Sequence, residues 1–100
     1  MRIATSRLDR NAAELLAIEA LRFLGDDPER LTRFLALTGV EPDDIGRLAR
    51  GPAFLGAVLD HVCGDATLLA RFVAQIARSP EDVDRARMLL SGGDWERDTA

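Results

Sequence analysis

The sequence of 100 residues contains no lysine and no tyrosine, only one cysteine and one histidine, and no long apolar run. Without about 20 consecutive apolar residues no segment is expected to span a bilayer, and the first ten residues lack the apolar stretch of a secretory signal. Cys63 has no second cysteine with which to form a disulfide, so side-chain burial must hold the fold. We therefore expect a cytoplasmic protein that makes no contact with a membrane.

The scarcity of reactive side chains argues against most catalytic sites. His61 and Cys63 lie two positions apart on a predicted helix, so they point to different sides and cannot share a metal ion. Gly92 and Gly93 precede polar residues rather than a helix, which argues against a phosphate-binding loop. We expect no bound cofactor and no metal, and the composition favours a non-catalytic role.

All 13 basic residues are arginine, and the formal net charge is −4. Residues 1–10 carry a net charge of +2, which leaves −6 on the remainder. Because clustered cations drive binding to phosphate backbones, this distribution argues against nucleic acid as a partner. Residues 34–48 resemble a helix-turn-helix, but its second helix would begin with Glu41, Asp43 and Asp44, which repel DNA. DNA binding is therefore the least favoured hypothesis.

Apolar side chains recur with the period of a helix rather than that of a strand. Leu55, Val58, Leu59 and Val62 form one such stripe. Each of the four prolines follows a plausible helix boundary, and proline is well tolerated at the first position of a helix. The sequence therefore predicts an all-α fold, a compact array of six short helices at residues 11–25, 28–38, 42–50, 52–63, 65–77 and 80–90.

Short polar residues and glycines are predicted to begin and end these helices. Asn11 and Asp65 are the expected N-caps of the two helices without a proline start, and Gly25, Gly39 and Gly64 are expected to end helices in the left-handed conformation. Residues 1–10 are predicted to form a flexible basic arm, residues 11–90 a single helical domain and residues 91–100 a mobile tail. The predicted core contains Leu16, Ala20, Leu21, Leu24, Leu31, Phe34, Leu35, Ile45, Leu48, Leu55, Val58, Leu59, Leu69, Phe72, Val73, Ile76 and Val83.

The chain resembles itself when it is shifted so that Phe34 falls on Phe72, an alignment that we call the repeat register. In this register nine identities occur in the 27 positions from 21 to 47, among them Leu21 with Leu59 and Pro42 with Pro80. The alternative is that short capped helices in a chain rich in leucine, alanine, arginine and aspartate look alike. We interpret the pattern as two similar three-helix units in tandem, at about residues 11–48 and 49–86, whose apolar faces meet in one core.

Residues 23–62 also carry a family resemblance. The strings DPERLTRFLALTG and PAFLGAVLDHV within this range resemble the domain of unknown function 3572 family, which consists of small bacterial proteins of about this length. The resemblance implies a helical fold, and it transfers no catalytic or binding residue.

Our leading functional hypothesis is a non-catalytic module that binds another protein or a second copy of itself. Apolar residues surround most of the predicted helix at 11–25, so a partner is expected to cover part of its surface. Large aromatic residues are common among interface hot spots, and Trp95 lies in an otherwise polar tail. The candidate contact residues are therefore Trp95, Phe23 and Ile18.

An alternative hypothesis is a small-ligand binder, or an enzyme, with its pocket between the two units. A pseudo-symmetric cleft there would receive Arg33, Arg71 and His61. The sign of such a site is a deep apolar pocket with converging polar groups rather than a flat patch.

Overall fold

The computed structural model of the protein describes residues 8–91, which contain six α-helices, one 3-10 helix and no strand. The elements are α1 (Arg10–Gly25), α2 (Pro28–Thr38), η2 (Pro42–Asp44), α3 (Ile45–Leu48), α4 (Pro52–Cys63), α5 (Ala66–Ile76) and α6 (Pro80–Leu90). The all-α prediction is confirmed, and α2, α4 and α6 have the predicted bounds. Residues 1–7 and 92–100, which hold most of the predicted arm and tail, lie outside the described residues.

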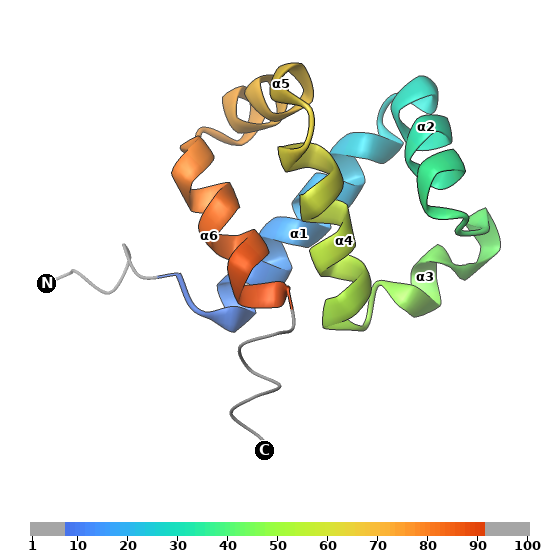
Figure 1. The fold of residues 1–100 in the computed structure, drawn as a ribbon, viewed down its shortest axis with the longest axis horizontal. Helices are drawn as coiled ribbons and strands as arrows, with labels where there is room; N and C mark the ends of the chain where they lie inside the picture. Colours follow the sequence, from blue (N-terminus) through green and yellow to red (C-terminus); the bar gives the residue numbers. More distant parts are fainter. Residues whose placement is uncertain (1–7, 92–100) are drawn as a thin grey trace, which may run out of the picture.

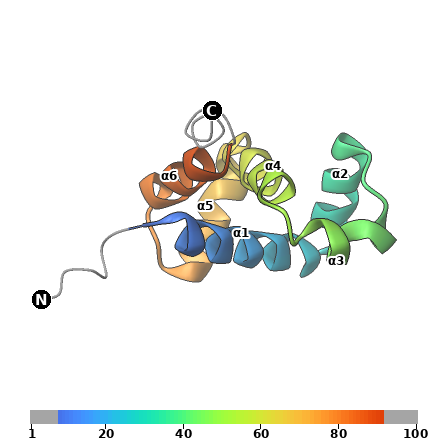
Figure 2. The same cartoon turned by 90° about the horizontal axis from the view of Figure 1, so that it is seen from below.

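Three helices form the centre of the fold. α1 packs against both α4 and α6, and α4 packs against α6. Figure 1 shows α1 running behind α4 and α6, with α2 and α3 at one end of the molecule, α6 at the other and α5 along the upper edge. In the view of Figure 2, α1 lies along the lower edge and α4 and α6 lie above it.

Acidic and hydroxyl side chains cap four of the helices, and one of these caps corrects our prediction. Asp9, rather than Asn11, is the N-cap of α1, because its carboxylate accepts a hydrogen bond of 2.8 Å from the backbone N–H of Ala12. Leu8 packs against the core. The ordered domain therefore begins before residue 11. Residues 8–10, the last three of the predicted arm, belong to this domain. The Asp65 carboxylate caps α5 as predicted, accepting from Thr67 and Leu68.

The helix ends differ from the prediction at two glycines. Gly39 is left-handed, with φ 76°, but Gly64 is right-handed with φ −77° and Gly25 belongs to the last turn of α1. Gly64 can stay right-handed because its N–H still donates to carbonyls of the preceding turn, at Asp60 and Val62. The second left-handed cap is Ala77, with φ 57°, which ends α5.

The third predicted helix, at residues 42–50, is shorter than expected. It consists of the 3-10 helix η2 and a single α-helical turn, α3, which ends at Leu48. Gly51 precedes Pro52 and has the extended conformation that proline imposes on its neighbour, with φ −108° and ψ 144°. The chain must therefore leave the helix before it reaches α4.

The core is centred on α1, α4 and α6, with Phe34 from α2 and Phe72 from α5. Nine predicted core residues are buried, namely Leu16, Ala20, Leu24, Phe34, Leu55, Val58, Leu59, Phe72 and Val83. The other eight are only partly buried and pack around this centre: Leu21, Leu31, Leu35, Ile45, Leu48, Leu69, Val73 and Ile76. The prediction missed Ala13, Ala17, Phe23, Phe54, Val62, Ala86 and Leu90, which are all buried. Three of these are alanines, whose small side chains allow helices to approach closely.

The local geometry of the chain recurs in the repeat register. α2 and α5 have the same length of 11 residues, and Pro28 and Thr38 at the ends of α2 are aligned with Ala66 and Ile76 at the ends of α5. Both helices follow an aspartate N-cap, and both end in a left-handed residue. The last residues of α1 and α4, Gly25 and Cys63, are likewise aligned, and the residues that follow them make equivalent C-cap hydrogen bonds.

Candidate functional site

One of the three predicted contact residues cannot be reached by a partner. Phe23 is only 1% exposed, because its ring lies 5.3 Å from that of Phe72 and the Arg30 guanidinium covers it at 4.0 Å. Arg30 also donates a hydrogen bond of 3.1 Å to the Phe23 carbonyl. The assignment of Phe23 as a contact residue is therefore wrong. Trp95 lies outside the described residues.

The outer side of α1 carries two exposed aliphatic residues. Leu15 is 58% exposed and Ile18 is 37% exposed, and residues three positions apart lie on the same side of a helix. The other sides of α1 are covered by α2, α4 and α6. Ile18 was a predicted contact residue, whereas Leu15 was missed as one, although it belongs to the apolar surface that surrounds the predicted helix. Leu37 and Met88 are also exposed, but they lie on α2 and α6.

His61 lies where α4 meets α2. Its ring packs edge-on against Phe34, with the ring centroids 5.2 Å apart, and Phe34 also contacts Phe54 at 5.9 Å. His61 is half-buried, and this burial lowers the pKa of the imidazole below its usual value. Asp65 opposes that shift, while the positive charge of Arg33 adds to it. The imidazole is therefore held in its neutral form more strongly than a free histidine.

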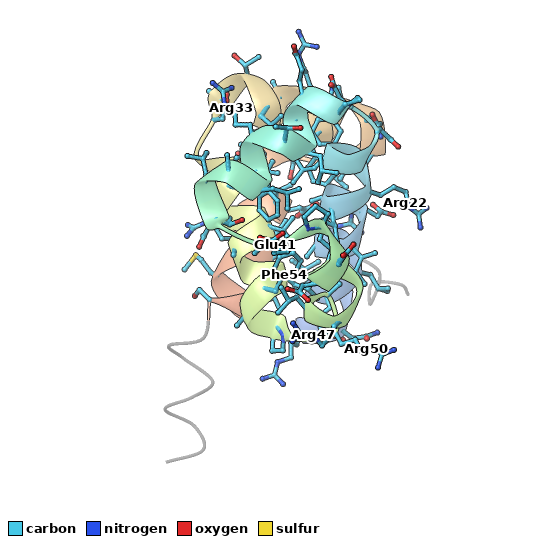
Figure 3. The ribbon with its side chains drawn as sticks, turned by 90° about the vertical axis from the view of Figure 1, so that its right-hand side faces the viewer. Arg22, Arg33, Glu41, Arg47, Arg50 and Phe54 are labelled. Atoms are coloured by element: carbon cyan, nitrogen blue, oxygen red, sulfur yellow. The ribbon has the colours of Figure 1, made fainter. Side chains whose placement is uncertain are left out.

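The residues predicted to share a pocket between the units do not come together in the hollow that Arg33 lines. Arg33 lines an open hollow of about 510 Å³ whose residues, Pro28, Glu29, Thr32, Arg33 and Ala36, all belong to α2. Arg71 and His61 do not line it. Arg71 lies on α5, which is separate from α2 in Figure 1. Figure 3 shows Arg33 pointing away from the core at the edge of α2.

Cys63 is the only cysteine of the chain, and it faces the joint between α4 and α6. It is half-buried, and burial raises the pKa of the thiol, which keeps it protonated. Nearby Arg87 pairs with Asp84 at 2.6 Å and with Asp60 at 3.5 Å, so this cluster links α6 to the end of α4. Among residues 8–91, no three histidine, cysteine or acidic side chains are grouped so that they could hold a metal ion.

The helix-turn-helix pattern folds into a tight corner rather than two full helices. After Gly39 the chain forms η2 and then α3, which together run only from Pro42 to Leu48. The second element is thus too short for a typical recognition helix. Figure 3 shows Glu41 at this corner, with Arg47 and Arg50 projecting outward from α3 and the turn after it. Arg47 pairs with Asp44 at 3.2 Å.

No single helix in the described range is long and apolar enough to cross a membrane. α4 and α5 together have sufficient length and apolar content, but the chain bends by 109° between them.

Comparison with known proteins gives a family and no closer relative. No curated protein and no solved structure matches the chain. One family model, described as protein of unknown function (DUF3572), matches residues 10–93, a range that holds all six α-helices. The chain therefore belongs to the DUF3572 family.

Proposed function

We propose that this protein is a non-catalytic module that binds another protein through the outer side of α1. The observation that carries the proposal is the exposure of Leu15 and Ile18 on a helix whose other sides are covered. Leu15 and Ile18 together define what we call the α1 face. The charged residues Glu19 and Arg22 come next along α1 and would supply part of a polar rim.

The α1 face is large enough to contribute to binding but too small to account for it alone. Full burial of a leucine or isoleucine is worth about 1.5–3 kcal/mol, so covering the exposed parts of these two side chains would yield about 2 kcal/mol. A specific complex needs several times that free energy. The partner must therefore also contact the polar residues around the α1 face.

Charged substitutions on the α1 face test the proposal. The double variant Leu15→Glu/Ile18→Glu should fold normally, because both side chains are exposed, and it should lose the bound partner in affinity purification. Leu37→Glu is a matched control, since Leu37 is 70% exposed on α2. Retention of the same partner by the parent chain and the control, but not by the double variant, supports the proposal. A partner retained equally by all three chains, or by none, refutes it.

The partner can also be a second copy of the chain. Sedimentation of the parent at increasing concentration distinguishes this case, because self-association through the α1 face would appear in the parent and vanish in the double variant. In that case the associated fraction of the chain should fall on dilution, with no other component present.

We further infer that the chain arose by duplication of a three-helix unit, at about residues 11–48 and 49–86. Support comes from the matching bounds of α2 and α5 and from the matching C-caps of α1 and α4. It also comes from the aromatic contacts. Phe23 and Phe72 form one pair, and the positions aligned with them in the repeat register, His61 and Phe34, form the other. Superposition of residues 11–48 on residues 49–86 in an experimental structure tests the inference. It fails if the axes of the matched helices diverge from α2 and α5 onward.

We also propose a bacterial cytosolic location. Its support is the single cysteine, which suits a reducing compartment, together with the small bacterial proteins that the sequence resembles. Fractionation of cells that produce the native chain tests this proposal, and recovery in the membrane or periplasmic fraction would contradict it.

A further inference from the structure

The contact between α2 and α4 depends on one titratable ring. Phe34 of α2 is fully buried, and its ring packs between those of Phe54 and His61, both from α4. His61 is the only histidine of the chain. No other side chain has an ordinary pKa between about 5 and 8, so His61 is the one side chain expected to change charge across that range.

α5 makes a matching contact without a titratable group. Phe72 of α5 is also fully buried, and its ring packs against Phe23 of α1 at 5.3 Å. Phe23 is the residue aligned with His61 in the repeat register. The structure thus contains its own reference contact, in which an aromatic hydrocarbon ring replaces the imidazole.

Two charged side chains among the described residues lie close enough to His61 to affect its pKa. Arg33 comes from α2, the helix whose position is in question, and Asp65 comes from the start of α5. The Asp65 carboxylate accepts hydrogen bonds from the backbone N–H groups of Thr67 and Leu68, and its negative charge still opposes the effect of Arg33 on the pKa of His61. Arg33 makes no ion pair with a described acidic residue. A positive charge on His61 would be attracted by Asp65 and repelled by Arg33, and burial of the ring is the largest cause that disfavours the charge.

We propose that protonation of His61 loosens α2 from α4 in mild acid, while α5 stays packed against α1. The proton binds a ring nitrogen of His61, and the new charge is repelled by Arg33 and poorly solvated beside Phe34. Separation of α2 from α4 relieves both penalties, because it hydrates the imidazolium and lets Arg33 move away. The opening would expose Phe34 and Phe54. The inference does not depend on the α1 face.

The direction of the effect follows from proton linkage. Burial, assisted by Arg33, lowers the pKa of His61 in the closed state below the value of 6.5 that it has when exposed. The open state then binds the proton more tightly than the closed state. The closed state is fully stable above pH 6.5 and loses stability as the pH falls toward the lowered pKa of the closed state.

Hydrogen exchange of the tag-free full chain tests the proposal. Between about pH 7.5 and 5.5, after correction for intrinsic exchange, the protection of α2 amides should fall several-fold relative to that of α5 amides. In His61→Phe, which copies the reference contact, this relative loss should disappear. The proposal would be overturned if amide protection fell equally in α2 and α5 of the parent. It would also be overturned if the loss of α2 protection relative to α5 persisted in His61→Phe.

A second variant keeps the test decisive if His61→Phe does not fold. Arg33→Gln removes an exposed charge and should reduce the relative loss of α2 protection, because the imidazolium no longer faces a like charge. The single histidine also gives unique ring signals in proton NMR. They should titrate below 6.5 in the parent and at a higher pH in Arg33→Gln. A parent titration at or above 6.5, or an unchanged midpoint in Arg33→Gln, contradicts the mechanism.

Discussion

The substitution Gly56→Ala tests how closely α6 is seated on α4. Gly56 is buried in the middle of α4, and a Cβ atom added there would lie 2.9 Å from the carbonyl oxygen of Leu90 and 3.3 Å from its carbonyl carbon. Ordinary contacts of a Cβ atom lie at 3.4–4 Å. The obstacle is backbone, so the last turn of α6 must move by about half an ångström to admit the methyl group.

Two opposing effects set the size of the change. Alanine in a helix interior is favoured over glycine by about 1 kcal/mol, whereas forcing extra volume into a packed interior costs about 1–3 kcal/mol. The net destabilisation should therefore fall between about 0 and 2 kcal/mol. The matched control is Gly46→Ala in α3, where a Cβ atom meets nothing within 4 Å. That substitution should stabilise the fold by about 0.4–1 kcal/mol.

Thermal unfolding followed by circular dichroism measures the contrast. A change of 1 kcal/mol moves the Tm of a domain this size by about 4–8 °C, so Gly56→Ala should melt on the order of 10 °C below Gly46→Ala. Both variants gain the same methyl group, so the effect of the substitution on the unfolded chain is nearly the same in both and largely cancels in the difference between their Tm values. If Gly56→Ala melts at or above Gly46→Ala, the close approach of α6 to α4 is incorrect.

Three further predictions follow from burial and capping. Phe34→Ala and Phe72→Ala should each lower the free energy of unfolding by about 3–5 kcal/mol in urea denaturation, since both rings are fully buried; a loss below about 1 kcal/mol would contradict the core. Asp65→Ala should destabilise the fold by about 1 kcal/mol through loss of two N-cap hydrogen bonds, and Asp65→Asn, which keeps an acceptor, should recover most of it. Cys63 should react more slowly with iodoacetamide in the folded chain than after denaturation, because burial raises the thiol pKa, and equal rates would refute that placement.

The sequence predicted helix starts well where a local signal determined them. Pro28, Pro52 and Pro80 each stand at the first residue of a helix, as expected from the fixed φ of proline. The start of α1 was harder, because Asp9 and Asn11 are both good N-caps and only the backbone geometry decides between them. The end of α5 at Ala77 carried no signal, since alanine rarely adopts a positive φ.

The inward side of α1 could not be predicted from periodicity. Apolar residues surround most of that helix, so the pattern alone does not say whether Phe23 or Leu15 faces the core. The packing of α5 determines which residue faces the core, because the ring of Phe72 packs against the ring of Phe23. Candidate contact residues on such a helix can therefore be identified only once its neighbours are known, which is why Phe23 was assigned wrongly and Leu15 was missed.

The proposed binding face can be traced to a difference between the two units. In the inferred repeat, Ile18 of α1 takes the place of Gly56 of α4, and Pro52 takes the place of Leu90. A side chain at position 56 would meet the backbone of Leu90, because the end of α6 lies over Gly56. Its counterpart Ile18 is left partly exposed, since the third helix of the first unit ends at Leu48 and the next residues turn into α4.

The short α3 therefore has two consequences for the molecule. It lets the chain pass directly from one unit to the next, and it leaves the outer side of α1 without the helix end that covers the corresponding side of α4. An isoleucine at the position aligned with Gly56 is compatible with this uncovered side, and it adds apolar area that a partner can bury. The short α3 thus accounts for the location of the proposed interface.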